Sequence, residues 1–399
     1  MIAFTFPGQG SQKPGMGAPW VDHPSWELVD EASIAAGRDI SDLLLVADED
    51  ELRLTRNAQL ATFVLSLVVL DAVERLGVEP SRLAGHSLGE YTALTASGAL
   101  DVPDGVRLVT ERGDAMQAAA DAREGTMAAV IGLDDSLVKI ACRRAAADVW
   151  VANYNAPGQV VIAGDPDDLA RAGALATELG AGRVLSIPVG GAFHTPFMAP
   201  ARDRLKKALG DLDLRTLDVP VVANVDALPH TEPSEWVGLL SAQLCSSVMW
   251  RQTLYQLADD GVTIFVELGP GSRLTGMARR TVVGAKHLSV SKPADLDGLL
   301  EALAGHTAAE NAPEGEHLFM TERVVVSPAA GLFTPDPGLG TGQRVEVGAR
   351  LGTVAGQDVR CPFSGTVMGV LALDGERVTS RQPIAWLATD APHLAFATG

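Results

Sequence analysis

The pentapeptide GHSLG at residues 85–89 decides how the first part of this chain is expected to fold. It has the form G-x-S-x-G, it follows a short apolar segment at 81–85, and it leads into an apolar segment at 88–100. A strand, a tight turn and a helix in this order lift the serine above the edge of a parallel sheet, near free N–H groups that can stabilise an oxyanion. Ser87 is therefore the candidate nucleophile, although the pentapeptide alone could be a glycine-rich turn that contains a serine by chance.

Strand-like and helix-like segments alternate on both sides of this turn. The strand-like segments are short and β-favouring, and the helix-like ones are longer with apolar residues at helical spacing: strands at 1–6, 81–85, 219–223 and 263–268, and helices at 57–76, 88–100 and 234–244. This alternation predicts a hydrolase-like α/β core with a largely parallel sheet, built from residues 1–124 and 190–303.

The segment at 125–189 interrupts that pattern. Its expected elements follow the order β-α-β-β-α-β: strands at 126–131, 150–153, 159–163 and 183–188, and helices at 137–147 and 167–179. This order predicts a small inserted ferredoxin-like subdomain.

A further change of composition falls near residue 304. Residues 304–317 are small, polar and interrupted by Pro and Gly, which predicts a linker. In residues 318–399, short Val-rich runs alternate with Gly and Pro turns and helical periodicity is absent. Two pairs of similar motifs recur there at nearly the same offset: VSPAAGLF at 326–333 with RCPFSGTV at 360–367, and GQRV at 342–345 with GERV at 375–378. Two similar β halves predict a small all-β barrel or flattened sandwich.

The composition excludes several classes of protein. The net charge of −19, from 31 basic and 50 acidic residues, argues against binding to nucleic acid or to an anionic membrane. The three cysteines lie far apart and form no cluster with zinc-ligand spacing, so we expect neither a disulfide framework nor a metal site. The N-terminus has no pattern typical of a signal peptide, and the apolar run at 60–73 is too short and too polar to span a bilayer. These features predict a cytoplasmic protein.

His194 is the best-placed candidate for the base that a serine nucleophile needs. It lies in GGAFHTPFM at 190–198, after a strand-like run, in a loop that Pro196 keeps irregular. His86 is adjacent to the serine, but at such a turn its side chain is expected to point the other way. Spacing alone leaves open that His194 is a loop histidine packed under the inserted segment.

A colinear series of motifs resembles the malonyl-CoA:acyl carrier protein transacylase family, which includes the acyltransferase domains of polyketide and fatty acid synthases. The resemblance covers residues 1 to about 290, and the series is far more specific than any one motif. The motifs are GQGSQ at 8–12, GHSLGEY at 85–91, ERGDAMQ at 111–117, NYNAPGQVVIAG at 153–164, FHTPFM at 193–198 and VELGPG at 266–271.

The resemblance implies roles for the residues that would carry out the chemistry. Ser87 would accept the acyl group, and His194 would act first as a base and then as an acid. The backbone carbonyl of Gln243, rather than an aspartate, would orient the histidine. The backbone N–H groups of Gln9 and Leu88 would form an oxyanion hole, where loss of one donor typically costs ~10²–10³ in turnover.

The resemblance also implies which residues would bind the substrate. Arg112 would hold the free carboxylate of a malonyl group, because a planar guanidinium can bind a carboxylate bidentately. Met116, one helical turn further on, would help to wall the acyl pocket. Phe193 would crowd an α-methyl group and so favour malonyl over methylmalonyl. Without the resemblance, a surface salt bridge would be the preferred interpretation of Arg112, and ordinary core packing is compatible with Met116.

Three further positions are expected near the site with less support. His86 and Asn155 would line it. Gln59 matches a family position near the pocket, and a buried structural amide is an equally good interpretation of this residue.

The implied reaction is a double displacement. A malonyl-serine forms from malonyl-CoA and is then transferred to the phosphopantetheine thiol of an acyl carrier protein, with no covalently bound cofactor. Carrier proteins are usually acidic, so we expect a local basic patch, for which Arg279, Arg280 and Lys286 are candidates.

The C-terminal segment resembles biotinyl and lipoyl carrier domains, which present a modifiable lysine on the hairpin between their halves. Here that hairpin would be AGQD at 355–358, and the last lysine of the chain is Lys292. We therefore expect no attached biotin or lipoate, and a role in docking, self-association or stability. An unrelated small β-barrel is the alternative interpretation, because fold does not fix function.

Three other functions remain open from the sequence. A hydrolase that clears acyl groups from carrier proteins could use the same nucleophile, but Arg112 counts against it. A general α/β-hydrolase esterase gives GQGSQ and the ERGDAMQ segment no place. A catalytically idle scaffold would not need the set of Ser87, His194 and Arg112.

Overall fold

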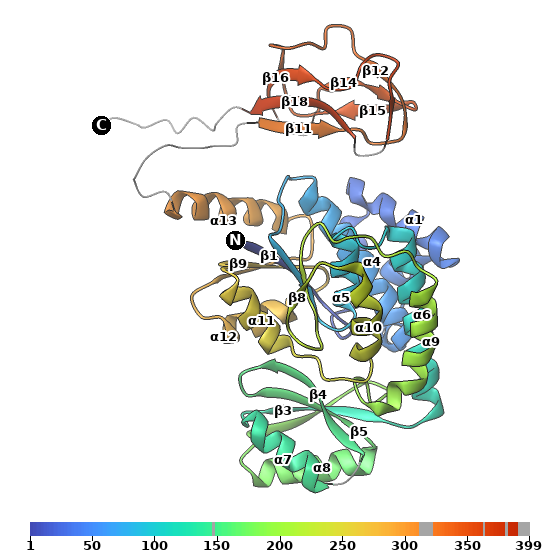
Figure 1. The fold of residues 1–399 in the computed structure, drawn as a ribbon, viewed down its shortest axis with the longest axis vertical. Coiled ribbons are helices and arrows are strands. Elements are labelled where there is room, and N and C mark those ends of the chain that lie inside the picture. Colours follow the sequence, from blue (N-terminus) through green and yellow to red (C-terminus); the bar gives the residue numbers. More distant parts are fainter. Residues whose placement is uncertain (146–147, 311–321, 362–363, 380–381, 390–399) are drawn as a thin grey trace. The chain divides into compact units, whose positions relative to one another are not determined.

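The computed structural model describes residues 1–145, 148–310, 322–361, 364–379 and 382–389 (Figure 1). The chain divides into two compact units, Met1–His306 and Thr307–Gly399. Each unit has a hydrophobic core of its own.

The centre of the first unit is a six-stranded sheet with the order β10-β9-β1-β2-β7-β8. Neighbouring strands are parallel except for β8, which runs antiparallel to β7. The strands are β1 (Ile2–Phe6), β2 (Arg82–Gly85), β7 (Val221–Val222), β8 (Pro229–His230), β9 (Ile264–Leu268) and β10 (Lys286–Val290). The four strands predicted for this core are present, and β8 and β10 are additional.

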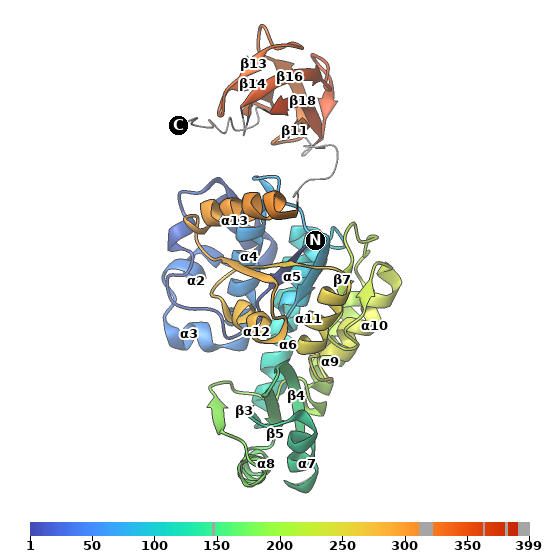
Figure 2. The same cartoon turned by 90° about the vertical axis from the view of Figure 1, so that its left-hand side faces the viewer.

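Helices cover both faces of this sheet (Figures 1 and 2). Side chains alternate along a strand, so neighbouring residues enter different cores. Phe4 of β1 packs in the large core with α4 (Thr55–Glu74), whereas Ala3 packs in a smaller core with α11 (Trp250–Asp259). The alternation explains why short, wholly buried strands can hold both layers of helices.

The remaining helices of this unit complete the two layers. They are α1 (Glu27–Ala36), α2 (Ile40–Leu45), α3 (Glu49–Arg53), α5 (Gly89–Ala96), α6 (Val102–Ala122), α9 (Ala199–Gly210), α10 (Pro233–Gln243), α12 (Arg273–Thr281) and α13 (Asp295–Glu310), with 3₁₀ turns at Ala18–Trp20, Pro24–Trp26 and Pro196–Met198.

Helix α4 is the one described helix that is long and apolar enough to cross a membrane. Within this unit, however, 89% of its apolar window is buried. Its side chains belong to the large core beside the sheet. The structure therefore uses the apolar run at 60–73 as part of a core helix.

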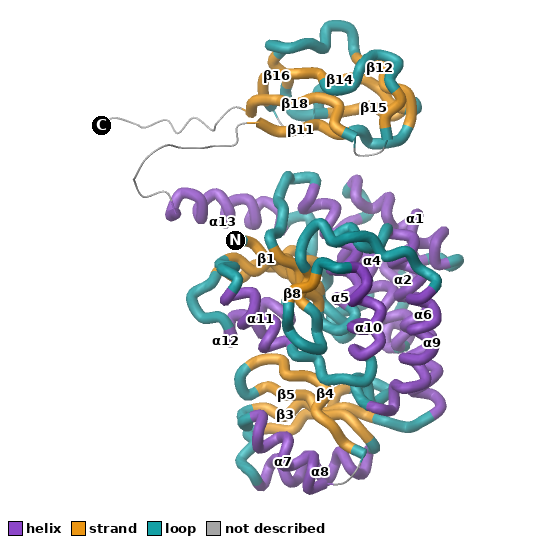
Figure 3. The backbone as a smooth tube through the Cα atoms, viewed as in Figure 1, coloured by secondary structure: helices purple, strands orange, loops and turns teal. Residues whose placement is uncertain are grey.

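The inserted segment forms a separate antiparallel sheet with the order β4-β5-β3-β6 (Figure 3). Its elements follow the order of a ferredoxin-like unit: β3 (Thr126–Ile131), α7 (Asp135–Ala145), β4 (Val149–Ala156), β5 (Gln159–Gly164), α8 (Pro166–Glu178) and β6 (Arg183–Ile187). Strand β4 also bridges to the core, because the N–H of Tyr154 donates to the carbonyl of Val248 over 2.9 Å.

The second unit contains two four-stranded antiparallel sheets, ordered β11-β18-β16-β13 and β15-β14-β12-β17. The strands are β11 (Glu322–Val326), β12 (Gly331–Pro335), β13 (Arg344–Val345), β14 (Arg350–Val354), β15 (Gln357–Arg360), β16 (Gly365–Val370), β17 (Arg377–Val378) and β18 (Pro383–Thr389). Ala355 and Gly356 form the tight turn between β14 and β15, both with positive φ. Pro362 and Phe363 of the repeated motif lie outside the described residues.

The predicted start of the linker at residue 304 is wrong. Helix α13 continues to Glu310. Ala-rich sequence such as AGHTAAE at 304–310 is small and polar enough to resemble a loop, yet alanine is the strongest helix former. The rest of the predicted linker, residues 311–317, lies outside the described residues.

Candidate active site

The turn between β2 and α5 places Ser87 at the C-terminal edge of the parallel sheet. Ser87 has a φ of 54°, a left-handed conformation that is costly for a residue with a side chain. The flanking glycines make this turn possible, since a Cβ on Gly85 would lie 1.8 Å from the carbonyl oxygen of Gly89. A Cβ on Gly89 would lie 2.0 Å from the carbonyl oxygen of Phe6. The motif G-x-S-x-G is therefore a steric requirement of this turn.

Asn224, which follows β7, holds the turn from both sides. Its Oδ1 accepts a hydrogen bond of 2.7 Å from the N–H of Ser87. Its Nδ2 donates a bond of 2.7 Å to the carbonyl of Gly85. Sequence reasoning missed this residue, and a lone Asn after a two-residue strand gave no signal.

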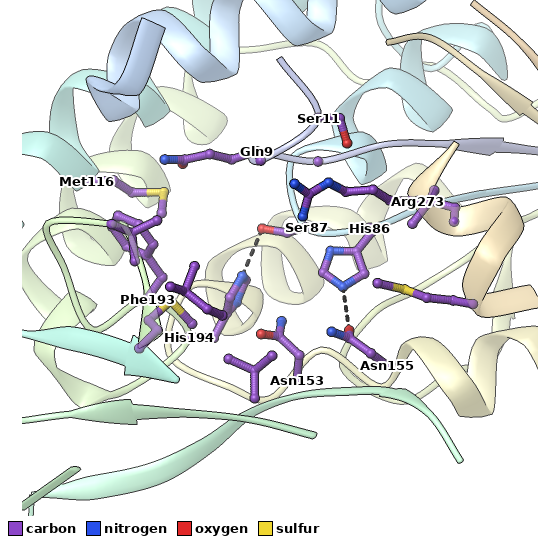
Figure 4. A pocket seen from close by; sticks show the side chains of 18 of the residues that line it. Gln9, Ser11, His86, Ser87, Met116, Asn153, Asn155, Phe193, His194 and Arg273 are labelled. Atoms are coloured by element: carbon purple, nitrogen blue, oxygen red, sulfur yellow. Dashed lines mark hydrogen bonds between the residues drawn. The ribbon is translucent and has the colours of Figure 1, made fainter. Parts of the chain in front are cut away.

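His194 lies directly beside the serine, as Figure 4 shows. The Oγ of Ser87 is 2.8 Å from Nε2 of His194, and Nδ1 of the same ring is 2.9 Å from the carbonyl oxygen of Gln243. A carbonyl can only accept, so Nδ1 carries the proton and Nε2 is free to accept one from Ser87. His194 also has a positive φ, of 62°. The alternative of a histidine packed away from the serine is excluded.

The environment keeps this imidazole neutral. Burial, and to a smaller extent the charge of Arg112, lowers the pKa of His194 to about 3. A neutral imidazole whose Nε2 faces a hydroxyl is the form that a general base needs.

Arg112 of α6 brings a guanidinium to the other side of the serine hydroxyl. Its Nη2 donates to Oγ of Ser87 over 3.1 Å and to Oε1 of Gln243 over 2.9 Å. Its Nη1 donates to Oε1 of Gln59 over 2.5 Å, and the guanidinium lies over the ring of Tyr91. The side chain is 1% exposed, which excludes the interpretation of Arg112 as a surface residue in a salt bridge.

Gln59 and Met116 form the wall behind the guanidinium. Gln59 of α4 is fully buried, and its Nε2 donates to the sulfur of Met116 over 3.3 Å. The same amide thus contacts a charged group and an apolar group of the pocket.

A single pocket contains most of the residues expected at the site. Ser87, His194, Arg112, Met116, Phe193, His86, Asn155 and Gln9 all line it. The two other expected residues, Gln243 and Leu88, do not line the pocket. Both are buried, and Leu88 lies at the start of α5. In the described part of the chain, neither the N–H of Gln9 nor that of Leu88 has an acceptor.

The expectation that the His86 side chain points away from Ser87 is wrong. Its ring lines the same pocket, and its Nε2 lies 2.9 Å from Oδ1 of Asn155 on β4 (Figure 4). The edge contact between His86 and Trp250 helps to set this direction. The pocket extends past Ser87 to the inserted sheet, where Asn153 and Asn155 of β4 line it.

Arg273, the first residue of α12, is a pocket residue that sequence reasoning missed. Its side chain reaches into the pocket from the side opposite Phe193 (Figure 4). Its place after the VELGPG motif at 266–271, where the carboxyl end of β9 meets a helix, was the available signal.

Known proteins match the first of the two compact units of the chain. The model of the acyl transferase domain family matches residues 3–301. The chain belongs to the acyl transferase family. It is 39% identical over 307 residues to the malonyl CoA-acyl carrier protein transacylase of Bacillus subtilis (strain 168), a match that covers 76% of this chain and 97% of the relative.

Solved structures of other acyltransferases match the same part of the chain. An acyl carrier protein S-malonyltransferase from Vibrio cholerae has a TM-score of 0.72 at 39% identity, over 75% of this chain and 99% of that one. A malonyl-transacylase solved in complex with the acyl carrier protein of a type II polyketide synthase also has a TM-score of 0.72, at 36% identity, over 75% of this chain and 99% of that one. The α/β fold described above is thus an acyltransferase fold.

The three candidates for a basic patch are all at least partly exposed. Arg279 and Arg280 are exposed in the last turn of α12. Lys286 is half-buried. Each of the three also makes an internal hydrogen bond: Arg279 donates to the carbonyl of His287, Arg280 to Oε1 of Gln159, and Lys286 to the carbonyl of Ala302.

Proposed function

We propose that this acyltransferase moves a malonyl group from malonyl-CoA to the phosphopantetheine thiol of an acyl carrier protein through a malonyl ester of Ser87. The observation that carries the proposal is the position of one hydroxyl oxygen. Oγ of Ser87 lies 2.8 Å from Nε2 of His194 and 3.1 Å from Nη2 of Arg112. A base and a carboxylate-binding group thus meet at the nucleophile.

The first half of the reaction forms the ester. Oγ of Ser87 attacks the thioester carbonyl carbon while its proton passes to Nε2 of His194. The carbonyl of Gln243 holds Nδ1–H and so stabilises the imidazolium that forms. When the carbon–sulfur bond breaks, the thiol of CoA leaves with the proton from His194.

The negative charge that develops on the carbonyl oxygen requires donors. The free N–H groups of Gln9 and Leu88 are proposed to supply them, since Leu88 is the residue before the first turn of α5 and the helix dipole adds to the field there.

Arg112 is proposed to distinguish malonyl from uncharged acyl groups. The N–H that now points to Oγ of Ser87 is available to a carboxylate, and Gln59 and Gln243 keep the plane of the guanidinium fixed. Because Arg112 is buried, such a charge-assisted fork is both strong and geometrically selective.

The second half of the reaction repeats these steps with another thiol. His194, neutral again, accepts the proton of the carrier's thiol, the sulfur attacks the ester carbonyl, and Ser87 leaves with the proton. Hydrolysis follows the same route with water in place of the thiol, which is why a hydrolase clearing acyl groups from carrier proteins is the alternative.

Transfer and hydrolysis are separated by one assay. The protein is incubated with malonyl-CoA, with and without a carrier protein bearing its phosphopantetheine arm. The proposal predicts malonyl-carrier protein as the main product and its loss in Ser87→Ala. Release of free malonate at the same rate with or without the carrier would instead identify a hydrolase.

We also propose that residues 318–399 have a biotinyl/lipoyl-like fold that carries no cofactor and serves docking, self-association or stability. Its support is the pair of antiparallel sheets and the β14–β15 hairpin, whose turn is Ala355-Gly356 where carrier domains have a lysine. Protein from cells supplied with biotin and lipoate should have the unmodified mass. An added mass of either group on residues 318–399 would overturn the proposal.

A further inference from the structure

Glu90 is a buried acid that the reaction described above does not use. It is the second residue of α5, three positions after Ser87, and is 1% exposed. In the described part of the chain it forms no direct ion pair. Its two oxygens accept one hydrogen bond each, Oε1 from the N–H of Asn224 over 2.6 Å and Oε2 from Nε2 of Gln243 over 2.5 Å.

The bond to Gln243 decides which way that amide faces. Nε2 of Gln243 donates to Glu90 and, over 2.8 Å, to the carbonyl of Ser87, so both of its N–H groups are used. The amide oxygen is therefore left to accept from Nη2 of Arg112. In the reversed orientation, the NH₂ would face the guanidinium of Arg112 and the oxygen would face the carbonyl of Ser87, so donor would meet donor and acceptor would meet acceptor.

The bond to Asn224 connects the same carboxyl group to the serine turn. The backbone of Asn224 donates to Glu90, and its side chain bonds the N–H of Ser87 and the carbonyl of Gly85. One acid thus lies at the junction of two hydrogen-bond chains, one leading to the guanidinium and one to the nucleophile.

The charge of Arg112 acts on the ionisation of Glu90. Burial raises the pKa of Glu90 to about 8, while its hydrogen bonds and the guanidinium of Arg112 act in the opposite direction. The carboxyl group and the guanidinium are thus coupled across the Gln243 amide.

We propose that Glu90 is a positioning residue, which orients the amide of Gln243 and thereby presents the guanidinium of Arg112 to the carboxylate of the substrate. This inference rests on the proposed malonyl transfer. The residue acts through its neighbours and touches no reacting atom.

The test is Glu90→Gln in the full-length protein. The new amide can still accept from Asn224, but its NH₂ faces that of Gln243 and forces the latter to reverse, which turns an NH₂ toward Arg112. We expect kcat/KM for malonyl-CoA to fall about tenfold or more, as loss of a hydrogen bond to a charged group would produce. The rate at which methanesulfonyl fluoride, a small neutral reagent, modifies Ser87 should stay within about threefold of the original rate, a change worth less than one such bond.

A merely structural role gives a different result. In that case both rates fall together, or neither changes, and either outcome overturns the inference. If Glu90→Gln does not fold, Gln243→Leu tests the same link, because it removes the amide while its backbone carbonyl still accepts from His194. It should lower kcat/KM for malonyl-CoA about tenfold or more, and an unchanged kcat/KM would overturn the inference.

Where both variants fold, their combination gives a further check. Because the two substitutions break one connection, Glu90→Gln with Gln243→Leu should lose no more than the worse single variant, and additive losses contradict the proposal. Assaying the wild-type protein distinguishes failure of the inference about Glu90 from failure of the proposed function. If it forms no malonyl-serine at all, the function is wrong, whereas an active wild type with an unselective Glu90→Gln refutes only the role of Glu90.

Discussion

Gln59 and Arg112 share a buried hydrogen bond of 2.5 Å between Oε1 and Nη1, at a place where neither side chain reaches solvent. The bond fixes one end of the guanidinium, and Gln243 fixes the other. Replacement of Gln59 by Leu should lower kcat/KM for malonyl-CoA about tenfold or more, since hydrogen bonds to charged groups contribute about 1.5–3 kcal/mol. Steady-state kinetics measures this loss. An unchanged kcat/KM would show that Arg112 keeps its position without the amide.

Arg112→Lys tests whether the shape of the cation matters as well as its charge. A lysine ammonium lacks the planar fork and cannot reach Gln59, Gln243 and the substrate in the same geometry. We expect about a 10²-fold loss of kcat/KM for malonyl-CoA, equivalent to one or two charge-assisted hydrogen bonds. Acetyl-CoA, which has no free carboxylate, should be affected much less. Equal losses for both thioesters would contradict the assignment.

The pH dependence of acylation follows from the state of His194. Because burial lowers its pKa to about 3, the imidazole is neutral across the whole range in which the protein is handled. The single-turnover rate of Ser87 acylation should therefore be nearly flat from about pH 5 to 8, where a histidine of ordinary pKa near 6.5 would give a clear inflection. Rapid-quench measurements give this profile, with circular dichroism to show that the protein stays folded. An inflection near 6.5 would mean that the imidazole is solvated.

The same shift has a consequence for stability. The folded state holds His194 neutral below the pH at which the unfolded chain takes up a proton. Its contribution is therefore fully present above pH 6.5 and is lost as the pH falls toward 3. Denaturant titrations should show wild type losing stability relative to His194→Gln as the pH falls from about 6.5 toward 3. A constant difference across this range would contradict the shift.

Phe193→Ser should relax the choice of acyl group. Phe193 is 5% exposed and lines the pocket beside His194. Its removal makes room for an α-methyl group, so the ratio of kcat/KM for methylmalonyl-CoA to that for malonyl-CoA should rise about tenfold, within the range for one methyl group in an apolar pocket. Competition between the two thioesters measures the ratio. Wild-type protein that already transfers both would refute this steric account.

Arg279→Glu with Arg280→Glu tests the basic patch. The double variant should raise KM for the carrier protein, and less so at high salt, because rim charges act mainly through association. Arg143→Glu with Arg144→Glu, in the exposed last turn of α7, makes the same change in net charge elsewhere and is the matched control. If both pairs change KM equally, the patch is not a docking site.

Local sequence was sufficient for the elements that form the core. The strand at 263–268 and the turn at 85–89 have their own signals, namely β-branched residues and closely spaced glycines. The linker was placed too early because its alanines suit a helix as well as a loop. Helices α1 to α3 were not predicted, because they are short and their apolar and polar residues show no clear helical spacing. Their helical structure depends on packing against the rest of the unit.

Sequence motifs predicted a site residue only where the chemistry of one residue requires another residue of a given type. A serine nucleophile needs a histidine, and this led to His194. Asn224 and Glu90 do not touch the reacting atoms, and their roles depend on hydrogen bonds across more than a hundred residues of chain. The direction of His86 depends on contacts with Asn155 and Trp250, which no local pattern contains.

The most direct test of the central claim is the intact mass of the protein after incubation with equal amounts of malonyl-CoA and acetyl-CoA. The account predicts one malonyl group on Ser87 of the wild type, none on Ser87→Ala, and loss of the preference for malonyl in Arg112→Ala. Acylation of another residue, or equal labelling of wild-type protein by both thioesters, would contradict it.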